Sequence, residues 1–371
     1  MLTMTSLTMY SVQTVLLAAL LGFLCLRKRA LDLYLFGIIS FWVISVIFIY
    51  ARYKSDQIYF YSNDQAYHLQ IITYYMPIEG FKIGLEELLN RRYPVTAPTL
   101  MISKLGIDII LANKFVQLVY LVLAYSSGRR YLVRNQISPR WWHVALFCGP
   151  IIVFNSSLAL RDIAIAYFTL LLVLEANPTL RAMGLIGATL LRPHLTISLL
   201  VGLIISKLFK KIKRRYFIPA LAFFTIATYV LGSYAYFVGA TIKDRVPLRA
   251  PTEIFAQFKF TRLAANFVSL QFLTLGETIV SASIPALFLS RFVFFDTILT
   301  PILFMFILLQ PSAKWNELRT SIFFAFIFFY GIISQTEWNS SRQNIPFFVI
   351  MGLVTVVGMN SRKAHLVEAS I

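Results

Sequence analysis

The sequence has few charged residues for its length. Asp, Glu, Lys and Arg make up 13% of the 371 residues, against about a quarter in a typical soluble domain, whereas hydrophobic residues make up 58%. This scarcity of charge excludes an ordinary soluble domain and indicates a chain that crosses a membrane several times. The sequence therefore predicts a polytopic membrane protein in contact with the lipid bilayer.

Cysteine and the common catalytic motifs are also scarce. The 2 cysteines, Cys25 and Cys148, both lie in apolar runs, so we expect packing residues and no disulfide framework or thiolate zinc site. Walker-type, GxGxxG, GxSxG and HExxH patterns are missing, which removes support for ATP hydrolysis, dinucleotide use, serine-hydrolase chemistry and zinc proteolysis. No His, Cys and carboxylate cluster has metal-ligand spacing, so we expect neither a metal nor a soluble cofactor.

Acidic residues are outnumbered by basic ones, 16 to 34, for a formal net charge of +18. In a soluble protein such a balance would suggest nucleic acid. Here no soluble basic face carries interleaved aromatic residues, so we expect no nucleic-acid partner. Two other causes account for the basic residues: cytoplasmic loops of membrane proteins gather Lys and Arg, and a site for an anionic head group would also be basic.

The placement of basic residues predicts the topology of an all-α membrane helix bundle. The run Met9–Leu26 ends at a basic triplet, has no cleavage site and is interpreted as a retained helix with the N-terminus outside. We predict about eleven crossings, a cytoplasmic C-terminus and a single membrane domain over residues 1–371. Further spans are expected near residues 31–51, 107–125, 141–158, 163–175 and 216–238, and extracytoplasmic loops at about 52–104 and 239–290.

Residues Ala182–Ser206 are predicted to form a hairpin. Arg181 precedes this apolar run and a basic cluster from Lys207 to Arg215 follows it, so a single crossing would violate the positive-inside bias. The tip is placed at Arg192-Pro193-His194. The first arm, Ala182–Leu191, has ten residues and would rise about 15 Å, roughly half the hydrocarbon thickness. We expect the tip to face a cavity open to the outside, because non-helical backbone at that depth must be buried in protein or face water.

This topology brings many ionisable residues to the outer side. Several arginines with few carboxylates suit a phosphate or pyrophosphate, because the guanidinium fork donates bidentate hydrogen bonds and keeps its charge. The candidates are Asp64, His68, Arg91, Arg92, Arg161, Asp162, Arg192, His194, Arg245, Arg249, Glu337 and Arg342.

Each of these candidates also has an interpretation in which its role is only structural. Arg161 and Asp162 could form an ion pair at a helix end, Arg192 could extend to the membrane interface, and His194 could be a hydrogen-bonded histidine without chemistry.

The candidates in the first outer loop also have interpretations other than phosphate binding. Arg91 and Arg92 could meet lipid head groups on an amphipathic segment. Asp64 and His68, four residues apart, would share a helix face and could act as base and orienting group or bind a metal weakly.

The order of these features resembles that of the Wzy and EpsG type of membrane polysaccharide polymerases. Two spans are followed by a polar outer loop with an aspartate (YSNDQAYH), an Arg-containing helix start (LALRDIAIA), a short hairpin with Arg and His at its tip (LLRPHLT) and a late outer Arg (SSRQNIPF). The resemblance covers most of the chain by arrangement and rests on short motifs. It implies a glycosyltransferase of the GT-C class in the bacterial inner membrane, using polyprenyl-pyrophosphate-linked sugars at the periplasmic face.

The resemblance also implies roles for individual residues. A polymerase would join lipid-linked oligosaccharide repeat units of a surface polysaccharide such as O-antigen or capsule, with a chain-length regulator protein as a further partner. Asp64 or His194 would accept the proton of the acceptor hydroxyl. His68, Asp162 and Glu337 would support the site, and the donor pyrophosphate would be held by Arg161, Arg192, Arg342, Arg245 and Arg249.

Other functions remain open at this point. The loop NDQAYH followed by RRYPVTAPTL also resembles the first outer loop of GT-C enzymes that transfer one sugar from polyprenyl phosphate, although Asp64 follows the second span where those enzymes carry the aspartate after the first. A flippase or exporter would use a basic outer cavity as a vestibule, but neither paired repeats nor polar residues on both sides of the midplane are found. A membrane O-acyltransferase is the remaining alternative, because of His194.

Overall fold

The computed structural model describes residues 7–28, 31–53, 68, 70–75, 78, 92–244, 317–333 and 345–368. All regular elements within these ranges are helical, so the prediction of an all-α fold is confirmed for this part of the chain. The number of crossings and the single membrane domain stay predictions. Most of the two expected outer loops, 52–104 and 239–290, lies outside the described residues.

Within the described residues, four helices are long and apolar enough to cross a membrane. They are α1 (Leu7–Arg27), α2 (Leu33–Tyr53, apolar to Ala51), α7 (Ile109–Arg134) and α13 (Phe217–Asp244, apolar to Ala235). Large apolar side chains such as Leu16, Phe23 and Ile44 are exposed on them. In water such surfaces would be unfavourable, whereas lipid accommodates them, so these helices indicate a membrane protein.

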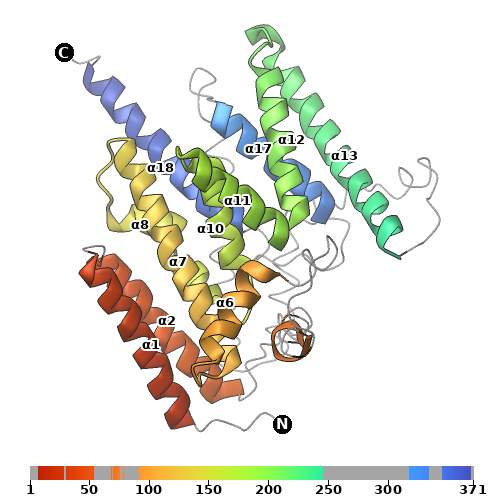
Figure 1. Ribbon diagram of the computed structural model, residues 1–371. Helices are drawn as coiled ribbons and strands as arrows, with labels where there is room; N and C mark the ends of the chain where they lie inside the picture. Colours follow the sequence, from red (N-terminus) through yellow and green to blue (C-terminus); the bar gives the residue numbers. More distant parts are fainter. Residues whose placement is uncertain are drawn as a thin grey trace. The chain divides into compact units, whose positions relative to one another are not determined.

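The chain divides into two compact units, which we describe separately. The first unit comprises Met1–Pro193 and Phe348–Ile371, and the second comprises His194–Phe347. In the first unit α7 packs against helices from before and after it in the chain, and its long buried face makes it the centre of that unit (Figure 1). Besides α1 and α2, the first unit contains α6 (Tyr93–Ser103), α8 (Trp141–Phe147), α9 (Pro150–Ser156), α10 (Asp162–Leu174) and α11 (Pro178–Leu191).

The helix α7 is longer than the predicted span 107–125. Its start is set by Asp108, whose carboxylate accepts hydrogen bonds from the backbone N–H groups of Ile110 and Leu111 at 2.9 and 3.0 Å. It continues past Arg129, whose guanidinium lies 2.7 Å from the Asp32 carboxylate. Arg129, Arg130 and Arg134, which come after the predicted span, therefore belong to the last turns of this helix.

The span predicted near residues 141–158 is not one continuous helix. The structure has two short helices there, α8 and α9, with Gly149 extended between them at φ −67° and ψ 171°. Pro150 begins α9, and because proline has no N–H it cannot continue the hydrogen bonding of the preceding helix. The apolar composition of the run concealed this break.

Close contact between α10 and α11 depends on glycine. The two helices pack side by side (Figure 1). A Cβ atom added at Gly184 of α11 would lie 2.5 Å from the backbone nitrogen of Leu172 and 2.7 Å from the carbonyl oxygen of Phe168 on α10. Gly187, one turn further along α11, faces the Phe168 ring at similarly short range. These glycines let the two backbones approach, as small residues do between membrane helices.

The predicted break at Arg192-Pro193 is confirmed, but the first arm is longer than expected. The helix α11 starts at Pro178, because the side chain of Asn177 accepts a hydrogen bond from the Thr179 N–H at 2.9 Å. It has 14 residues instead of the predicted ten, and α12 (Pro193–Phe209) follows with 17. Whether the two helices form a hairpin stays a prediction.

In the second unit α12 and α13 each pack against α17 (Glu317–Ile333). Gly202 of α12 lies against the backbone of Ser321, and Gly331 of α17 lies against Tyr229 of α13. Phe209, Phe224 and Phe324 pack their rings together, with centroids 5.3 to 6.1 Å apart. The last helix, α18 (Ile345–Glu368), begins in this unit and continues in the first.

Candidate functional site

The start of α10 is fixed by neighbouring elements. The indole nitrogen of Trp42 on α2 donates to the carbonyl oxygen of Ser156 at 3.1 Å, which anchors the end of α9 before the loop that leads to α10. The backbone N–H of Ala164 donates to the side-chain oxygen of Gln117 on α7 at 3.3 Å. Gln117 thus satisfies one of the free amides in the first turn of α10. As predicted, α10 begins at the Arg161-Asp162 pair.

Asp162 forms a buried ion pair with Arg192. The Arg192 Nη2 donates to Asp162 Oδ1 at 2.9 Å, and the two side chains are 5% and 2% exposed. Arg192 follows the last residue of α11 and precedes Pro193, which disfavours a helical conformation at Arg192 and ends the helix there. The pair joins the first turn of α10 to the end of α11, so the two helices run antiparallel.

Arg161 contacts the same helix end through its own guanidinium. Its Nη1 donates to the carbonyl oxygen of Leu191 at 2.7 Å. This carbonyl belongs to the last turn of α11, where the partial negative charge of the helix dipole favours a cation. The Arg161 side chain is partly exposed, in contrast to that of Arg192. Arg161 therefore combines a fixed position with access from outside the protein core.

His68 lies beside this group of residues. Its imidazole is fully buried, and the guanidinium Nη1 of Arg92 donates to its Nδ1 at 3.0 Å. The amide of Asn113 on α7 lies 3.4 Å from its Nε2 and donates to Thr99 Oγ1 at 3.2 Å. Arg92 adopts the left-handed conformation, φ 57° and ψ 41°, which is uncommon for a residue with a side chain.

Packing joins the His68 segment to the loop before α10. The one-turn π-helix η2 (Ile71–Tyr75) buries Ile72 against Ala159, and Ile110 of α7 packs on both. Arg161 lies two residues after Ala159, and this places it close enough for its positive charge to act on His68. Single π-turns are frequent at functional sites.

His68 is held in its neutral form. Burial lowers its pKa well below the ordinary 6.5, and the positive charges of Arg92 and Arg161 lower the pKa further. Arginine can only donate, so Nδ1 of His68 is the acceptor in the contact with Arg92. His68 therefore fixes the Arg92 side chain and is itself unsuited to take up a proton.

The neutral state of His68 predicts a dependence of stability on pH. Because the folded-state pKa lies below the unfolded value of 6.5, the stabilisation is complete above pH 6.5 and is lost as the pH falls below it. One such group changes the free energy of unfolding by at most about 1.4 kcal/mol per pH unit. We expect the thermal midpoint of the wild-type protein to fall more between pH 7.5 and 5 than that of His68→Gln. His194→Gln, the same change at a partly exposed histidine, should keep the wild-type slope, and equal slopes in all three proteins would contradict the assignment.

The structure brings together some of the predicted site residues. Arg161, Asp162 and Arg192 meet where α10 begins and α11 ends, with His68 within reach of the charge of Arg161. His194 belongs to the second unit, where its ring stacks on Phe329 with centroids 5.6 Å apart. The predicted residues Asp64, Arg91, Arg245, Arg249, Glu337 and Arg342 lie outside the described residues.

Two residues of this region, Asn113 and Gln117, were not identified from the sequence; they contact His68 and the first turn of α10, respectively. Arg92 was among the candidates, with contact to lipid head groups as its alternative, and it binds His68. Asn113 and Gln117 are separated by one helical turn within an apolar helix, and both are buried. Polar residues at this spacing in a membrane helix were the signal that could have identified them.

Within the described region the site carries an excess of positive charge. Arg92, Arg161 and Arg192 contribute three positive charges, Asp162 contributes one negative charge, and His68 is neutral. A site with this balance favours an anion with several oxygen atoms, because guanidinium groups donate paired hydrogen bonds to carboxylates and phosphates. No three His, Cys, Asp or Glu side chains in the described part of the chain gather as metal ligands would.

Comparison with known proteins adds no assignment. No family model, curated protein or solved structure matches the chain. The function is therefore argued from the chemistry of the site itself.

Proposed function

We propose that the protein is a polysaccharide polymerase of the bacterial inner membrane. It would join polyprenyl-pyrophosphate-linked oligosaccharide repeat units of a surface polysaccharide at the periplasmic face. One observation carries the proposal most strongly: three arginines and one carboxylate lie at the ends of apolar helices, and one of these arginines, Arg161, is partly exposed. Such an arrangement suits a lipid-linked anion, whose tail stays in the bilayer while its phosphates meet the arginines.

In this proposal the arginines stabilise the leaving group. The acceptor hydroxyl oxygen attacks the anomeric carbon, the bond from that carbon to the pyrophosphate oxygen breaks, and polyprenyl pyrophosphate leaves with the electron pair. Arg161 contacts the phosphates, and the Asp162–Arg192 pair holds the helix ends on which Arg161 depends. The sequence adds Arg245, Arg249 and Arg342 as further candidates for phosphate binding.

The acceptor hydroxyl loses its proton to a base during this step. We assign this role to Asp64, with His194 as the second candidate. Asp162 is unsuited to it because its carboxylate is bound to Arg192. Pyrophosphate is a good leaving group, so no acid is needed to protonate it.

The experiment is a glycan gel of a deletion strain that expresses Arg161→Gln at wild-type membrane levels. Loss of the phosphate contact is expected to abolish the polymer ladder and leave single repeat units on the lipid carrier. Arg215→Gln, which removes an exposed arginine of the second unit, serves as the control and should restore the ladder.

Other outcomes identify the alternative functions. Normal chain length with a missing side sugar would indicate a transferase of single sugars. Lipid-linked repeat units that accumulate on the cytoplasmic leaflet would indicate a flippase. A wild-type ladder from Arg161→Gln would contradict the proposed role of Arg161.

A further inference from the structure

A group of basic residues that the proposed function does not use lies where α12 ends and α13 begins. Residues 207–215 include six basic side chains, whereas residues 194–243 contain no Asp or Glu. The hydrogen bonding at the end of α12 continues through Lys211, whose backbone N–H donates to the carbonyl oxygen of Leu208 at 3.1 Å. The positive charges therefore project from an ordered turn and have no acidic neighbour in the sequence.

One face of α12 is an apolar stripe that leads to two of these basic residues. The large apolar side chains on this face are between 45% and 61% exposed, and they are Ile197, Leu200, Ile204 and Leu208. They follow one another at spacings of three or four residues, so they share one side of the helix. Lys207 and Lys211, both exposed, are one turn apart and continue this spacing, because they come three and seven residues after Ile204. The apolar stripe therefore ends in two neighbouring cations.

The other side of α12 is covered by protein. Gly202 lies against the backbone of Ser321 on α17, and the rings of Phe209 and Phe324 pack with centroids 5.3 Å apart. This contact uses the face that carries the buried residues of α12. The stripe, on the exposed side, is the face of α12 that is suited to contact lipid.

The length of the stripe matches one leaflet of a bilayer. Ile197 and Leu208 are 208 − 197 = 11 residues apart, a rise of about 16 Å, roughly half the hydrocarbon thickness. Tyr216, just before α13, is 51% exposed, as is typical of an aromatic residue at the membrane interface. The rings of Phe209 and Phe217, with centroids 5.2 Å apart, hold the start of α13 beside the end of α12 (Figure 1). The two lysines are therefore placed at the level of the lipid head groups.

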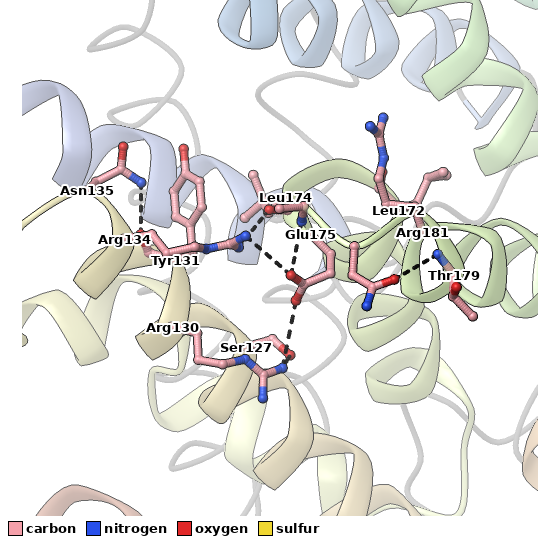
Figure 2. A network of polar contacts seen from close by, with 12 residues as sticks. Ser127, Arg130, Tyr131, Arg134, Asn135, Leu172, Leu174, Glu175, Thr179 and Arg181 are labelled. Atoms are coloured by element: carbon pink, nitrogen blue, oxygen red, sulfur yellow. Dashed lines mark hydrogen bonds and ion pairs between the residues drawn. The ribbon is translucent and has the colours of Figure 1, made fainter.

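The basic residues at the end of α7 are arranged differently. Arg134 lies 3.2 Å from one oxygen of the Glu175 carboxylate, and Arg130 lies 3.8 Å from the other (Figure 2). A lipid phosphate there would compete with a carboxylate of the protein. Among the residues that the structure describes, no carboxylate forms an ion pair with Lys207 or Lys211. An anion from outside therefore meets less competition at the end of α12.

From these observations we infer that α12 carries a binding site for an anionic phospholipid. The phosphate lies between the ammonium groups of Lys207 and Lys211, and one acyl chain lies along the stripe from Leu208 to Ile197. Free phosphate would meet the lysines and leave the stripe uncovered. A zwitterionic lipid would bring its own positive charge next to the lysines. This inference is independent of the proposed enzymatic function.

Lipid binding to the purified full-length protein tests the inference. Native mass spectrometry in detergent would compare dioleoyl phosphatidylglycerol with dioleoyl phosphatidylcholine and with dihexanoyl phosphatidylglycerol, whose chains are too short to cover the stripe. We expect the wild-type protein to bind the first lipid most tightly. Lys207→Gln/Lys211→Gln should bind it about 25-fold more weakly, since each basic residue near an anionic membrane surface contributes a factor of about five. In a thermal-shift assay, inorganic phosphate should stabilise the wild-type protein less than dioleoyl phosphatidylglycerol does.

Three further variants separate the site from total charge and from folding. Lys207→Arg/Lys211→Arg keeps both charges and should bind dioleoyl phosphatidylglycerol as wild type does. Lys104→Gln/Arg130→Gln removes two exposed positive charges from the first unit and should also bind as wild type does. Ile204→Ala keeps both lysines and shortens the stripe, so it should narrow the difference between the long-chain and short-chain lipids.

Several results would overturn the inference. One is equal binding of dioleoyl phosphatidylglycerol by the wild-type protein and Lys207→Gln/Lys211→Gln. Another is an equal loss of binding in the control Lys104→Gln/Arg130→Gln. Equal affinity of the wild-type protein for the long-chain and short-chain lipids would contradict the role of the stripe, and stabilisation by inorganic phosphate as strong as by the lipid would identify a phosphate site instead.

Discussion

Arg192→Leu is expected to destabilise the protein by about 3–5 kcal/mol, the largest effect of any single substitution considered. The change leaves the Asp162 carboxylate, 2% exposed, without the charge that lies 2.9 Å away in the native structure. Burying a charge removes its hydration, and without a partner no attraction offsets this unfavourable free energy. The measurement is the midpoint of thermal or denaturant unfolding in detergent or nanodiscs.

The double variant Asp162→Leu/Arg192→Leu separates the charge from the packing. Replacing both partners of a buried ion pair by apolar residues of similar size is often neutral or stabilising, so we expect most of the lost stability to return. The remaining loss should be about 0.3–1 kcal/mol, the contribution of a carboxylate in the first turn of a helix. If single and double variants are equally unstable, the unpaired charge of Asp162 is not the cause of the lost stability.

Gly184→Leu is expected to separate α10 from α11. Even a single added carbon would lie 2.5 Å from the Leu172 backbone nitrogen, and the backbone cannot turn away as a side chain can. The helices must move apart, with an overpacking cost of about 1–3 kcal/mol. The shift should also disrupt the Arg161 bond to Leu191 at the far end of the same helix pair.

A matched glycine substitution controls for this effect. Gly37 lies in α2, and a Cβ atom there would meet nothing within 4 Å. Gly37→Leu should therefore leave the unfolding midpoint unchanged or raise it, because glycine is about 1 kcal/mol worse than alanine within a helix. A cysteine pair at the facing ends of α10 and α11 could report the separation by crosslinking yield. Equal behaviour of the two glycine variants would show that α10 and α11 do not depend on close contact.

Sequence patterns predicted where α10 begins and where α11 ends. An Arg-Asp pair at the edge of an apolar run and an Arg-Pro step are local signals, because charge ends a membrane run and proline disfavours helix at the preceding residue. The prediction that Arg161 and Asp162 could pair with each other missed the contact of Asp162 with Arg192. The side chains of adjacent residues at a helix start point in different directions, so Asp162 pairs with Arg192 at the end of the antiparallel helix α11, 30 residues away in the sequence.

Other features depended on contacts that no local pattern contains. The Asn177 cap starts α11 at Pro178, one turn before the predicted start at Ala182. Arg181, which was taken as the boundary of the arm, lies in the first turns of the helix. His68 and Arg92 are 24 residues apart in the sequence, and most of the residues between them lie outside the described part of the chain. The pairing of distant polar residues depends on packing, which periodicity and charge bias do not report.

The proposed function makes one direct prediction about the Asp162–Arg192 pair. The double variant Asp162→Leu/Arg192→Leu keeps the fold but removes a guanidinium and the carboxylate that orients it next to Arg161. Expressed in a deletion strain at wild-type membrane levels, it can be compared with Arg192→Lys and wild type on a glycan gel. We predict single repeat units and no ladder from the double variant, with short chains from the lysine variant, which retains charge without the planar fork. A full wild-type ladder from the stable double variant would show that the buried arginine and aspartate are structural, and would contradict the account of a pyrophosphate site at this end of the helices.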